Sequence, residues 1–272
     1  MSDRGPITSA ANPRIRGAIA LRDRAARDAQ GLTIVDGVRE LRRAIDADAD
    51  VSEAFVCPAL IDSDEAAAVV DALRRRGVPL TDVSESVFAR VAFGDRAEGV
   101  VGLVSIPPSD LDRLRVGPDA LVVVLEGVEK PGNLGAVLRS ADGAGVDAVI
   151  FADPRTDPYN PNVVRASLGT IFGVPIAVAS GSQTRDWLAH NAIRSIAARV
   201  DAALAYTAVD MRGPTALILG AEVSGLGDAW SGPDVTSVRV PMLGVADSLN
   251  VSVTAAVLMY EARRQRDEVR GQ

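Results

Sequence analysis

The hydrophobic pattern is clearest in the second half of the chain, where short apolar segments alternate with helical stretches. The apolar segments lie at 121–125, 148–151, 175–178 and 216–219. Nearly continuous apolar runs of this length are typical of strands that are buried on both faces of a parallel sheet. We expect helices between or after them at about 134–144, 160–168, 184–191 and 248–266. The pattern predicts a doubly wound α/β fold, in which ligands bind beyond the carboxyl ends of the strands.

The first half of the chain alternates shorter elements. We expect strands at 32–35, 51–56 and 100–106, and helices at 12–29, 38–45 and 63–76. Asn12 and Pro13 suit the start of the first helix, and Gly77 suits the end of the third. Pro107 and Pro108 then indicate a linker. The chain is therefore predicted to hold a small α/β domain at 1–106, a linker at 107–118 and a larger domain at 119–272.

The composition narrows the function classes. Of the 272 residues, 47% are hydrophobic and 24% are charged, which is typical of a globular protein. No apolar run reaches the length of a membrane span, and the N-terminus has no signal-like core, so we expect a cytoplasmic protein. Cys57 is the single cysteine and His190 the single histidine. An internal disulfide, a cysteine-based zinc site and a two-histidine metal site are therefore excluded, and we expect no metal.

The charge is unevenly distributed. A net charge of −7 argues against a general polyanion binder, yet residues 1–45 hold nine arginines against five acids. The arginines are Arg4, Arg14, Arg16, Arg22, Arg24, Arg27, Arg39, Arg42 and Arg43. Lys130 is the only lysine, and the codon bias of a GC-rich genome would account for the use of arginine in place of lysine. Whatever the cause, these positive groups are planar guanidinium groups, whose geometry is suited to binding phosphate.

The chain does not match the common nucleotide-binding and esterase motifs. Gly127 and Gly132 have the spacing of a P-loop, but Asn133 and Leu134 stand where lysine and a hydroxyl are required. The dinucleotide fingerprint G-x-G-x-x-G is absent as well. Ser224 lacks the first glycine of G-x-S-x-G, and a triad would need His190, which we interpret as a surface residue. ATP hydrolysis, NAD chemistry and serine esterase chemistry are therefore disfavoured.

Three polar loops remain, each following a predicted buried strand. They contain "PGNLGAVLRSADGAG", "LILGAEVSGL" and "VRVPMLGVADSLNVSVTAAVLMYEA". In order and spacing they resemble the three signature motifs of the TrmH/SpoU branch of the SPOUT superfamily. That branch contains S-adenosylmethionine-dependent RNA 2′-O-ribose methyltransferases. The resemblance covers about 135 residues and implies a C-terminal SPOUT domain with a trefoil knot, S-adenosylmethionine as cofactor and a homodimer.

The resemblance extends more loosely to the N-terminal half. "DGVRELRRAI" and "EGVVGLV" are similar to the L30e-like substrate-binding extension that precedes many such domains. The layout, including Arg165 in "NPNVVRASLGT", is most similar to the thiostrepton-resistance ribosomal RNA methyltransferases. Arg165 matches a second family arginine that contacts RNA, although it also suits a helix surface. We expect Arg14, Arg16, Arg22 and Arg24 to contribute further RNA contacts.

The resemblance assigns Arg139 as the catalytic arginine. Methyl transfer to a 2′-hydroxyl is an in-line displacement in which the attacking oxygen loses a proton. Some accounts of the family make this arginine the general base, but a guanidinium is effectively always protonated. We therefore expect Arg139 to stabilise the developing alkoxide or to position a phosphate.

The other matched site residues are polar or line the expected cofactor pocket. Asn133, Ser248, Asn250 and Glu222 match the family's catalytic pocket, although Ser248, Asn250 and Asp247 also suit helix capping. Glu222 could accept hydrogen bonds from loop N–H groups or favour a nearby sulfonium. Cofactor contacts are implied for Gly220, Val240, Met242 and Leu249, of which the last three would equally suit an ordinary core. The apolar face with Val253, Val257 and Tyr260 suits the dimer contact.

Three functions remain open on the sequence. The leading hypothesis is 2′-O-methylation of structured RNA, with ribosomal RNA favoured over transfer RNA because of the L30e-like extension. The alternatives are an RNA-binding relative without catalysis and a methyltransferase that acts on a base. The chain retains all five polar residues of the family motifs, which argues against the non-catalytic alternative. These residues are Asn133, Arg139, Glu222, Ser248 and Asn250.

Overall fold

The computed structural model describes residues 5–94, 97–222 and 224–270, so Arg4 and Val223 lie outside the described residues. The chain divides into two compact units. Unit 1 consists of residues 1–107 and 159–173, and unit 2 consists of residues 108–158 and 174–272. The division after Pro107 lies where the sequence suggests a linker. Residues 159–173, however, belong to unit 1, although the sequence pattern places them in the C-terminal domain.

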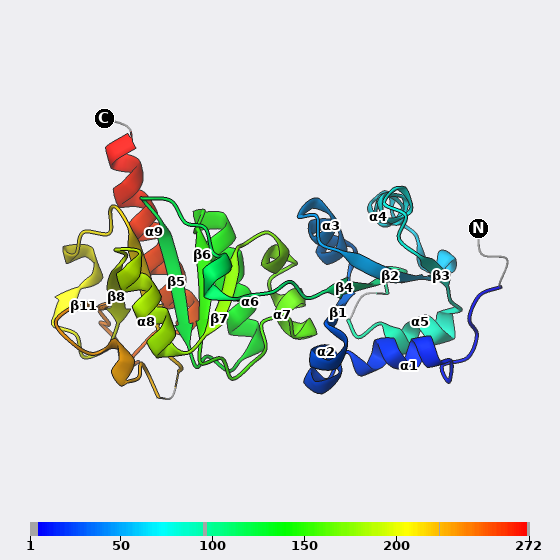
Figure 1. Cartoon of the computed structure of the whole chain (residues 1–272), viewed down its shortest axis with the longest axis horizontal. Helices are drawn as coiled ribbons and strands as arrows, with labels where there is room; N and C mark the ends of the chain where they lie inside the picture. Colours follow the sequence, from blue (N-terminus) through cyan, green and yellow to red (C-terminus); the bar gives the residue numbers. More distant parts are fainter. Residues whose placement is uncertain (1–4, 95–96, 223, 271–272) are drawn as a thin grey trace. The chain divides into compact units, whose positions relative to one another are not determined.

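Unit 1 is built on a four-stranded sheet with the order β1-β4-β2-β3 (Figure 1). The β1–β4 and β2–β4 pairs are antiparallel, and the β2–β3 pair is parallel. The strands are β1 (Leu32–Asp36), β2 (Val51–Val56), β3 (Leu80–Asp82) and β4 (Val100–Ser105). The helices are α1 (Pro13–Ala20), α2 (Arg24–Gln30), α3 (Val38–Asp46), η1 (Pro58–Leu60), α4 (Asp64–Arg75), α5 (Glu85–Val91), α7 (Pro161–Ala166) and η3 (Thr170–Phe172).

The prediction of one helix at 12–29 is wrong. The structure has two helices, α1 and α2, because Asp23 adopts an extended backbone that interrupts the helical hydrogen bonds. Gly31 ends α2 in the left-handed conformation, which glycine tolerates best. Asn12 caps α1, as expected, by accepting a hydrogen bond from the Arg14 backbone N–H at 2.9 Å. Strand β3 and helix α5 were missed because both are too short to show a clear hydrophobic period.

Unit 2 is built on a seven-stranded sheet with the order β7-β6-β5-β10-β8-β11-β9, and each neighbouring pair of its described strands is parallel. The strands are β5 (Leu121–Glu126), β6 (Ala148–Ala152), β7 (Ile176–Ala179), β8 (Arg194–Ala198), β9 (Leu204–Ala205), β10 (Thr215–Leu219) and β11 (Val235–Arg239). The predicted parallel α/β architecture is confirmed. The order reverses between β5 and β10, because the chain first adds β6 and β7 on one side and later strands on the other.

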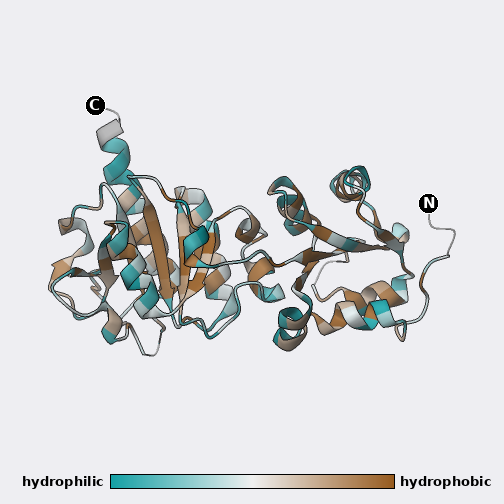
Figure 2. Ribbon diagram, viewed as in Figure 1, coloured by the Kyte–Doolittle hydropathy of each residue, from teal (hydrophilic) through white to brown (hydrophobic). Residues whose placement is uncertain are grey.

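Helices cover both faces of this sheet. They are η2 (Leu111–Arg113), α6 (Pro131–Ala144), α8 (Gly181–His190), η4 (Tyr206–Ala208), η5 (Asp228–Trp230) and α9 (Val251–Arg270). Val122 and Val124 of β5 pack in one core with Leu188 of α8 and the fully buried Trp230. Alternate strand residues point to the opposite face, where α6 and α9 pack together. Figure 2 shows the central strand β5 among the most hydrophobic parts of this unit.

Strand β8 was not predicted, and β11 was implied only as the buried strand before the third loop. Both have mixed sequences, RSIAA and VTSVR, with exposed positions beside buried ones. They lie toward one edge of the sheet, where burial on both faces is incomplete, so they lack the continuous apolar run that marks central strands. The last helix starts at Val251 instead of residue 248. No helix in the described part of the chain is long and apolar enough to cross a membrane.

Candidate functional site

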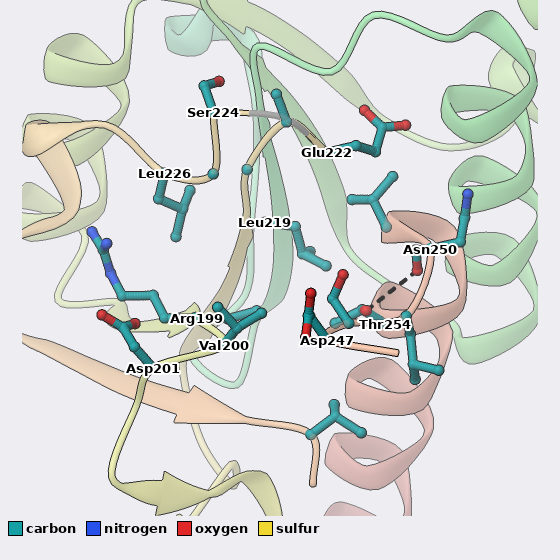
Figure 3. Close-up of a pocket in the computed structure, with 18 of the residues that line it drawn as sticks. Arg199, Val200, Asp201, Leu219, Glu222, Ser224, Leu226, Asp247, Asn250 and Thr254 are labelled. Carbon is teal, nitrogen blue, oxygen red and sulfur yellow. Dashed lines mark hydrogen bonds between the residues drawn. The ribbon is translucent and has the colours of Figure 1, made fainter. Parts of the chain in front are cut away.

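The second and third predicted loops converge on one cavity of about 670 Å³ in unit 2 (Figure 3). It lies beyond the carboxyl ends of β8, β10 and β11, beside the start of α9. This is where the general rule for parallel sheets places a ligand. Its volume falls within the range of about 300–1,000 Å³ that is usual for small-molecule sites. The sequence-predicted residues that line it are Gly220, Glu222, Val240, Ser248, Leu249 and Asn250.

The loop after β10 forms one wall of the cavity through a sharp reversal. The Gly225 backbone N–H donates to the Ala221 carbonyl oxygen at 2.9 Å, and Gly225 itself has a positive φ of 65°. The reversal brings Gly225 so close to Gly220 that a Cβ on Gly220 would lie 2.3 Å from the Gly225 carbonyl carbon. Glycine at position 220 is therefore required for the loop to close.

Three predicted catalytic residues are joined by hydrogen bonds across the ends of three elements. The Asn133 side-chain amide, in the first turn of α6, donates to the Glu222 carboxylate in the loop after β10. The Asn250 amide donates to the Asn133 Oδ1 at 3.2 Å. Asn133 therefore connects the first loop to the other two, and Glu222 and Asn250 also line the cavity.

Asn250 has a second role as the cap of α9. Its Oδ1 accepts from the Ser252 backbone N–H at 2.9 Å, which leaves its amide free to reach Asn133. Ser248 and Asp247 were also candidate caps, but they lie in the preceding loop and line the cavity with exposed side chains. Capping and cavity formation are therefore combined only at Asn250.

Arg139 lies apart from the cavity lining. It is an exposed residue of α6, six positions after Asn133. In the part of the chain that the structure describes, no hydrogen bond or ion pair holds its guanidinium. A charged group in this state is available to an incoming ligand.

The cavity also contains residues that the sequence analysis missed. Arg199, Val200 and Asp201 follow β8 directly and line the wall opposite the β10 loop (Figure 3). The signal was a short apolar run, Ile196 to Ala198, followed by two charged residues. Met242, in contrast, was predicted as a cofactor contact but does not line the cavity.

The donor set of the cavity fits S-adenosylmethionine. Three carboxylates, those of Asp201, Glu222 and Asp247, line it with a single guanidinium, that of Arg199. A net negative lining favours a ligand that carries a sulfonium and an ammonium group. Leu219, Leu226, Val240 and Leu249 supply apolar surface suited to a purine. Among the described residues, no group of three or more histidine, cysteine, aspartate or glutamate side chains is placed to hold a metal ion.

Arg165 belongs to unit 1, on helix α7. Its guanidinium carbon lies 5.7 Å from the centre of the Phe93 ring, within the range of a cation–π contact. Asp36 is beside it and accepts hydrogen bonds from the Phe93 and Gly94 backbone N–H groups at 2.8 and 2.6 Å. Burial raises the pKa of Asp36, while those hydrogen bonds and the charge of Arg165 act in the opposite direction. Arg165 is therefore part of a packed polar cluster of unit 1.

The four N-terminal arginines differ in their surroundings. Arg14 pairs with Glu53, and Arg24 lies 3.5 Å from the Asp28 carboxylate. Arg22 donates to the backbone carbonyls of residues 90, 91 and 92 at the end of α5. Arg16 is exposed and has no such partner among the described residues. Arg22 thus has a clear structural role, and Arg16 is the most available to a ligand.

Models of two protein families match separate stretches of the chain. Residues 120–260 match the SpoU rRNA Methylase family, and residues 12–102 match the MRM3-like substrate binding domain. A 23S rRNA (guanosine-2′-O-)-methyltransferase RlmB of Xylella fastidiosa is 33% identical over 85% of this chain and 95% of its own length. A 23S rRNA (uridine(2479)-2′-O)-methyltransferase of Streptomyces viridochromogenes is 36% identical over 61% of this chain, and the match spans 60% of that relative.

Solved structures are similar over nearly the whole chain. A crystal structure of an RNA 2′-O ribose methyltransferase has 41% identity and a TM-score of 0.84, covering 96% of this chain and 99% of its own. The SpoU methyltransferase AviRb of S. viridochromogenes, in complex with AdoMet, has 30% identity and a TM-score of 0.85, covering 94% and 100%. The predicted enzyme class and cofactor are thereby confirmed, whereas the knot and the homodimer stay predictions. The chain belongs to the SpoU rRNA methylase family.

Proposed function

We propose that this protein transfers a methyl group from S-adenosylmethionine to a ribose 2′-hydroxyl of 23S ribosomal RNA. The observation that carries the proposal is the convergence of the three signature loops. Asn133 bonds to both Glu222 and Asn250 at the edge of a cavity with a net negative lining. The 23S target is supported by the names of the relatives and by the match of residues 12–102 to a substrate-binding domain. We therefore also propose that the protein acts in the cytoplasm.

Some residues of the chain bind the cofactor, and others act on the acceptor hydroxyl. S-adenosylmethionine supplies an electrophilic methyl group when it is bound. The backbone around Gly220 and the side chains of Val240 and Leu249 hold the purine, and the carboxylates favour the cationic end. Asn133 and Asn250 orient the polar groups near the acceptor hydroxyl. Arg139, whose guanidinium has no partner among the described residues, stabilises the negative charge that develops on the attacking oxygen.

The proposed function is tested by locating the methyl group. Ribosomal RNA from cells with and without the gene is mapped for 2′-O-methylated nucleotides, and the purified protein is assayed on the same RNA. Nuclease P1 digestion and mass spectrometry distinguish a methylated ribose from a methylated base. We expect one 23S ribose methyl group to depend on the gene. A base methyl group, or a target in transfer RNA only, would contradict the proposal.

We further propose that the active protein is a homodimer that uses α9. Val253 and Tyr260 are seven positions apart on this helix, so they share one face, and their side chains are 47% and 53% exposed. Tyr260→Arg is expected to shift the protein from dimer to monomer in sedimentation velocity, with unchanged secondary structure by circular dichroism. A wild-type protein that sediments as a monomer at micromolar concentration would contradict the dimer.

We propose that unit 1 binds the RNA, with Arg16, Arg24 and Arg165 among the contacts. Replacing Arg16 and Arg24 with glutamine is expected to weaken RNA binding and to reduce the salt dependence of the binding constant, by about one unit of slope per lost phosphate contact. Arg22→Gln is the control for structure, since that side chain holds the end of α5 and should lower the melting temperature. An unchanged salt slope in the double variant would place the RNA elsewhere.

A further inference from the structure

Glu126 occupies a special place at the reversal of strand order in the sheet of unit 2. It is the last residue of β5, which is the strand next to β10. Its carboxylate accepts two hydrogen bonds from residues more than one hundred positions later in the chain. The Gly227 backbone N–H donates at 2.6 Å, and the Trp230 indole N–H donates at 2.9 Å. Glu126 does not itself line the cavity.

The two donors hold the β10 loop at its far end. Gly227 directly follows Leu226, and Gly220, Gly225 and Leu226 are part of the cavity wall. A Cβ on Gly227 would lie 3.4 Å from both Glu126 carboxylate oxygens, an ordinary van der Waals distance, so the carboxylate lies directly against this residue. Any displacement of Gly227 is therefore transmitted to the neighbouring residues of the wall.

Trp230 extends the connection to the opposite wall. Its side chain is fully buried, and its backbone carbonyl accepts from the Arg199 Nη2 at 3.2 Å. Arg199 lines the cavity beside Asp201. The ends of β5, the β10 loop and β8 are thus linked through Glu126 and Trp230. Arg185 of α8 separately holds the Ala229 carbonyl at 2.7 Å, so the loop retains a second attachment if Glu126 is lost.

The chemistry requires a carboxylate at this position. Two N–H donors converge on one side chain, and an ionised carboxylate accepts from both. A glutamine amide offers one acceptor oxygen, so its NH₂ group would face one of the two donors. Hydrogen bonds to an ionised acceptor are also about twice as strong as those between neutral groups. Glu126→Gln is therefore nearly isosteric but breaks the arrangement.

We propose that Glu126 is a positioning residue for cofactor binding: it fixes the β10 loop through Gly227 and Trp230 and thereby sets the affinity for S-adenosylmethionine. The inference rests on the proposed function only in naming this ligand. Because Glu126 acts through the loop, its loss weakens cofactor binding and leaves the chemical step at saturating cofactor comparatively intact.

The test compares Glu126→Gln and Glu126→Ala with Glu129→Gln in the full chain. Glu129 is the matched control, since it is an exposed carboxylate that pairs with Arg155 and forms no hydrogen bond to the described residues of the β10 loop. Isothermal titration with S-adenosylmethionine is expected to show affinity about tenfold weaker or more in both Glu126 variants, as is usual for losing a charged hydrogen bond, and wild-type affinity in the control. The KM for the cofactor should rise in parallel, with kcat within about threefold of wild type.

A second variant separates positioning from general loss of structure. Trp230→Phe removes one donor and keeps an aromatic ring, and its effect on cofactor affinity should not add to that of Glu126→Ala. Folded Glu126 variants with unchanged affinity, or a fall in kcat at unchanged affinity, would overturn the proposal. So would additive effects of the two substitutions. Cofactor titration needs no RNA, so a wild-type protein that binds S-adenosylmethionine but methylates no 23S ribose would refute only the proposed function.

Discussion

Arg139→Ala is expected to lower kcat for RNA methylation by about 100- to 1,000-fold, which is the usual cost of removing a donor that stabilises an oxyanion. Arg139 is exposed on α6, and no interaction among the described residues fixes its guanidinium, so its removal should not disturb the fold. It does not line the cavity, so the affinity for S-adenosylmethionine should remain within about twofold of wild type. The measurement is single-turnover methylation with a tritium-labelled methyl donor, together with cofactor titration.

A matched arginine controls for the loss of one positive charge. Arg113→Ala removes an exposed guanidinium of unit 2 that lies 3.6 Å from the Asp110 carboxylate, and it should leave turnover unchanged. Arg139→Lys keeps the charge but not the planar fork, so we expect partial activity. Turnover close to wild type in Arg139→Ala would remove this residue from the catalytic centre.

Gly220→Ala is expected to weaken S-adenosylmethionine binding by about 10- to 100-fold, since forcing atoms into a packed site costs about 1–3 kcal/mol. The new Cβ would lie 2.3 Å from both the carbonyl carbon and the carbonyl oxygen of Gly225. These are backbone atoms, which cannot move away as a flexible side chain does. The loop must therefore open, and the wall of the cavity is displaced. Isothermal titration measures the affinity, and thermal melting reports the stability.

Gly117→Ala is the control for this prediction. A Cβ at Gly117 meets no heavy atom within 4 Å, and its backbone does not have a positive φ. This variant should bind the cofactor like wild type and melt at the same temperature or slightly higher. If Gly220→Ala also binds like wild type, the β10 loop is more adaptable than its packing indicates, and the account of the cavity wall is wrong.

Much of the candidate site follows from local sequence. Gly220, Val240, Leu249, Glu222 and Asn250 were assigned to one site by the resemblance of their loops to the family motifs, and the rule that parallel strands end at one edge of a sheet agrees with that grouping. The hydrophobic runs also gave the central strands, because burial on both faces leaves few polar positions. The helix predicted at about 134–144 corresponds to α6, which starts earlier, with Pro131 at its first position.

Other parts of the site have at most a weak local signal. Arg199 and Asp201 follow β8, whose partly exposed residues do not form a continuous apolar run. Arg22 stabilises the end of α5 by donating hydrogen bonds to carbonyl groups almost seventy residues away in the chain. The grouping of residues 159–173 with unit 1 also involves distant contacts, such as the hydrogen bond of 2.7 Å from the Thr33 hydroxyl to the Tyr159 carbonyl.

The sequence by itself determined the family motifs, the central parallel strands and the type of chemistry, because these depend on residue type, spacing and local periodicity. Only the tertiary structure decided which polar atoms meet: Asn133 with Glu222 and Asn250, and Glu126 with Gly227 and Trp230. Hydrogen bonds form over about 3 Å and within narrow angles, so they depend on how distant segments pack. No pattern along a chain specifies those distances.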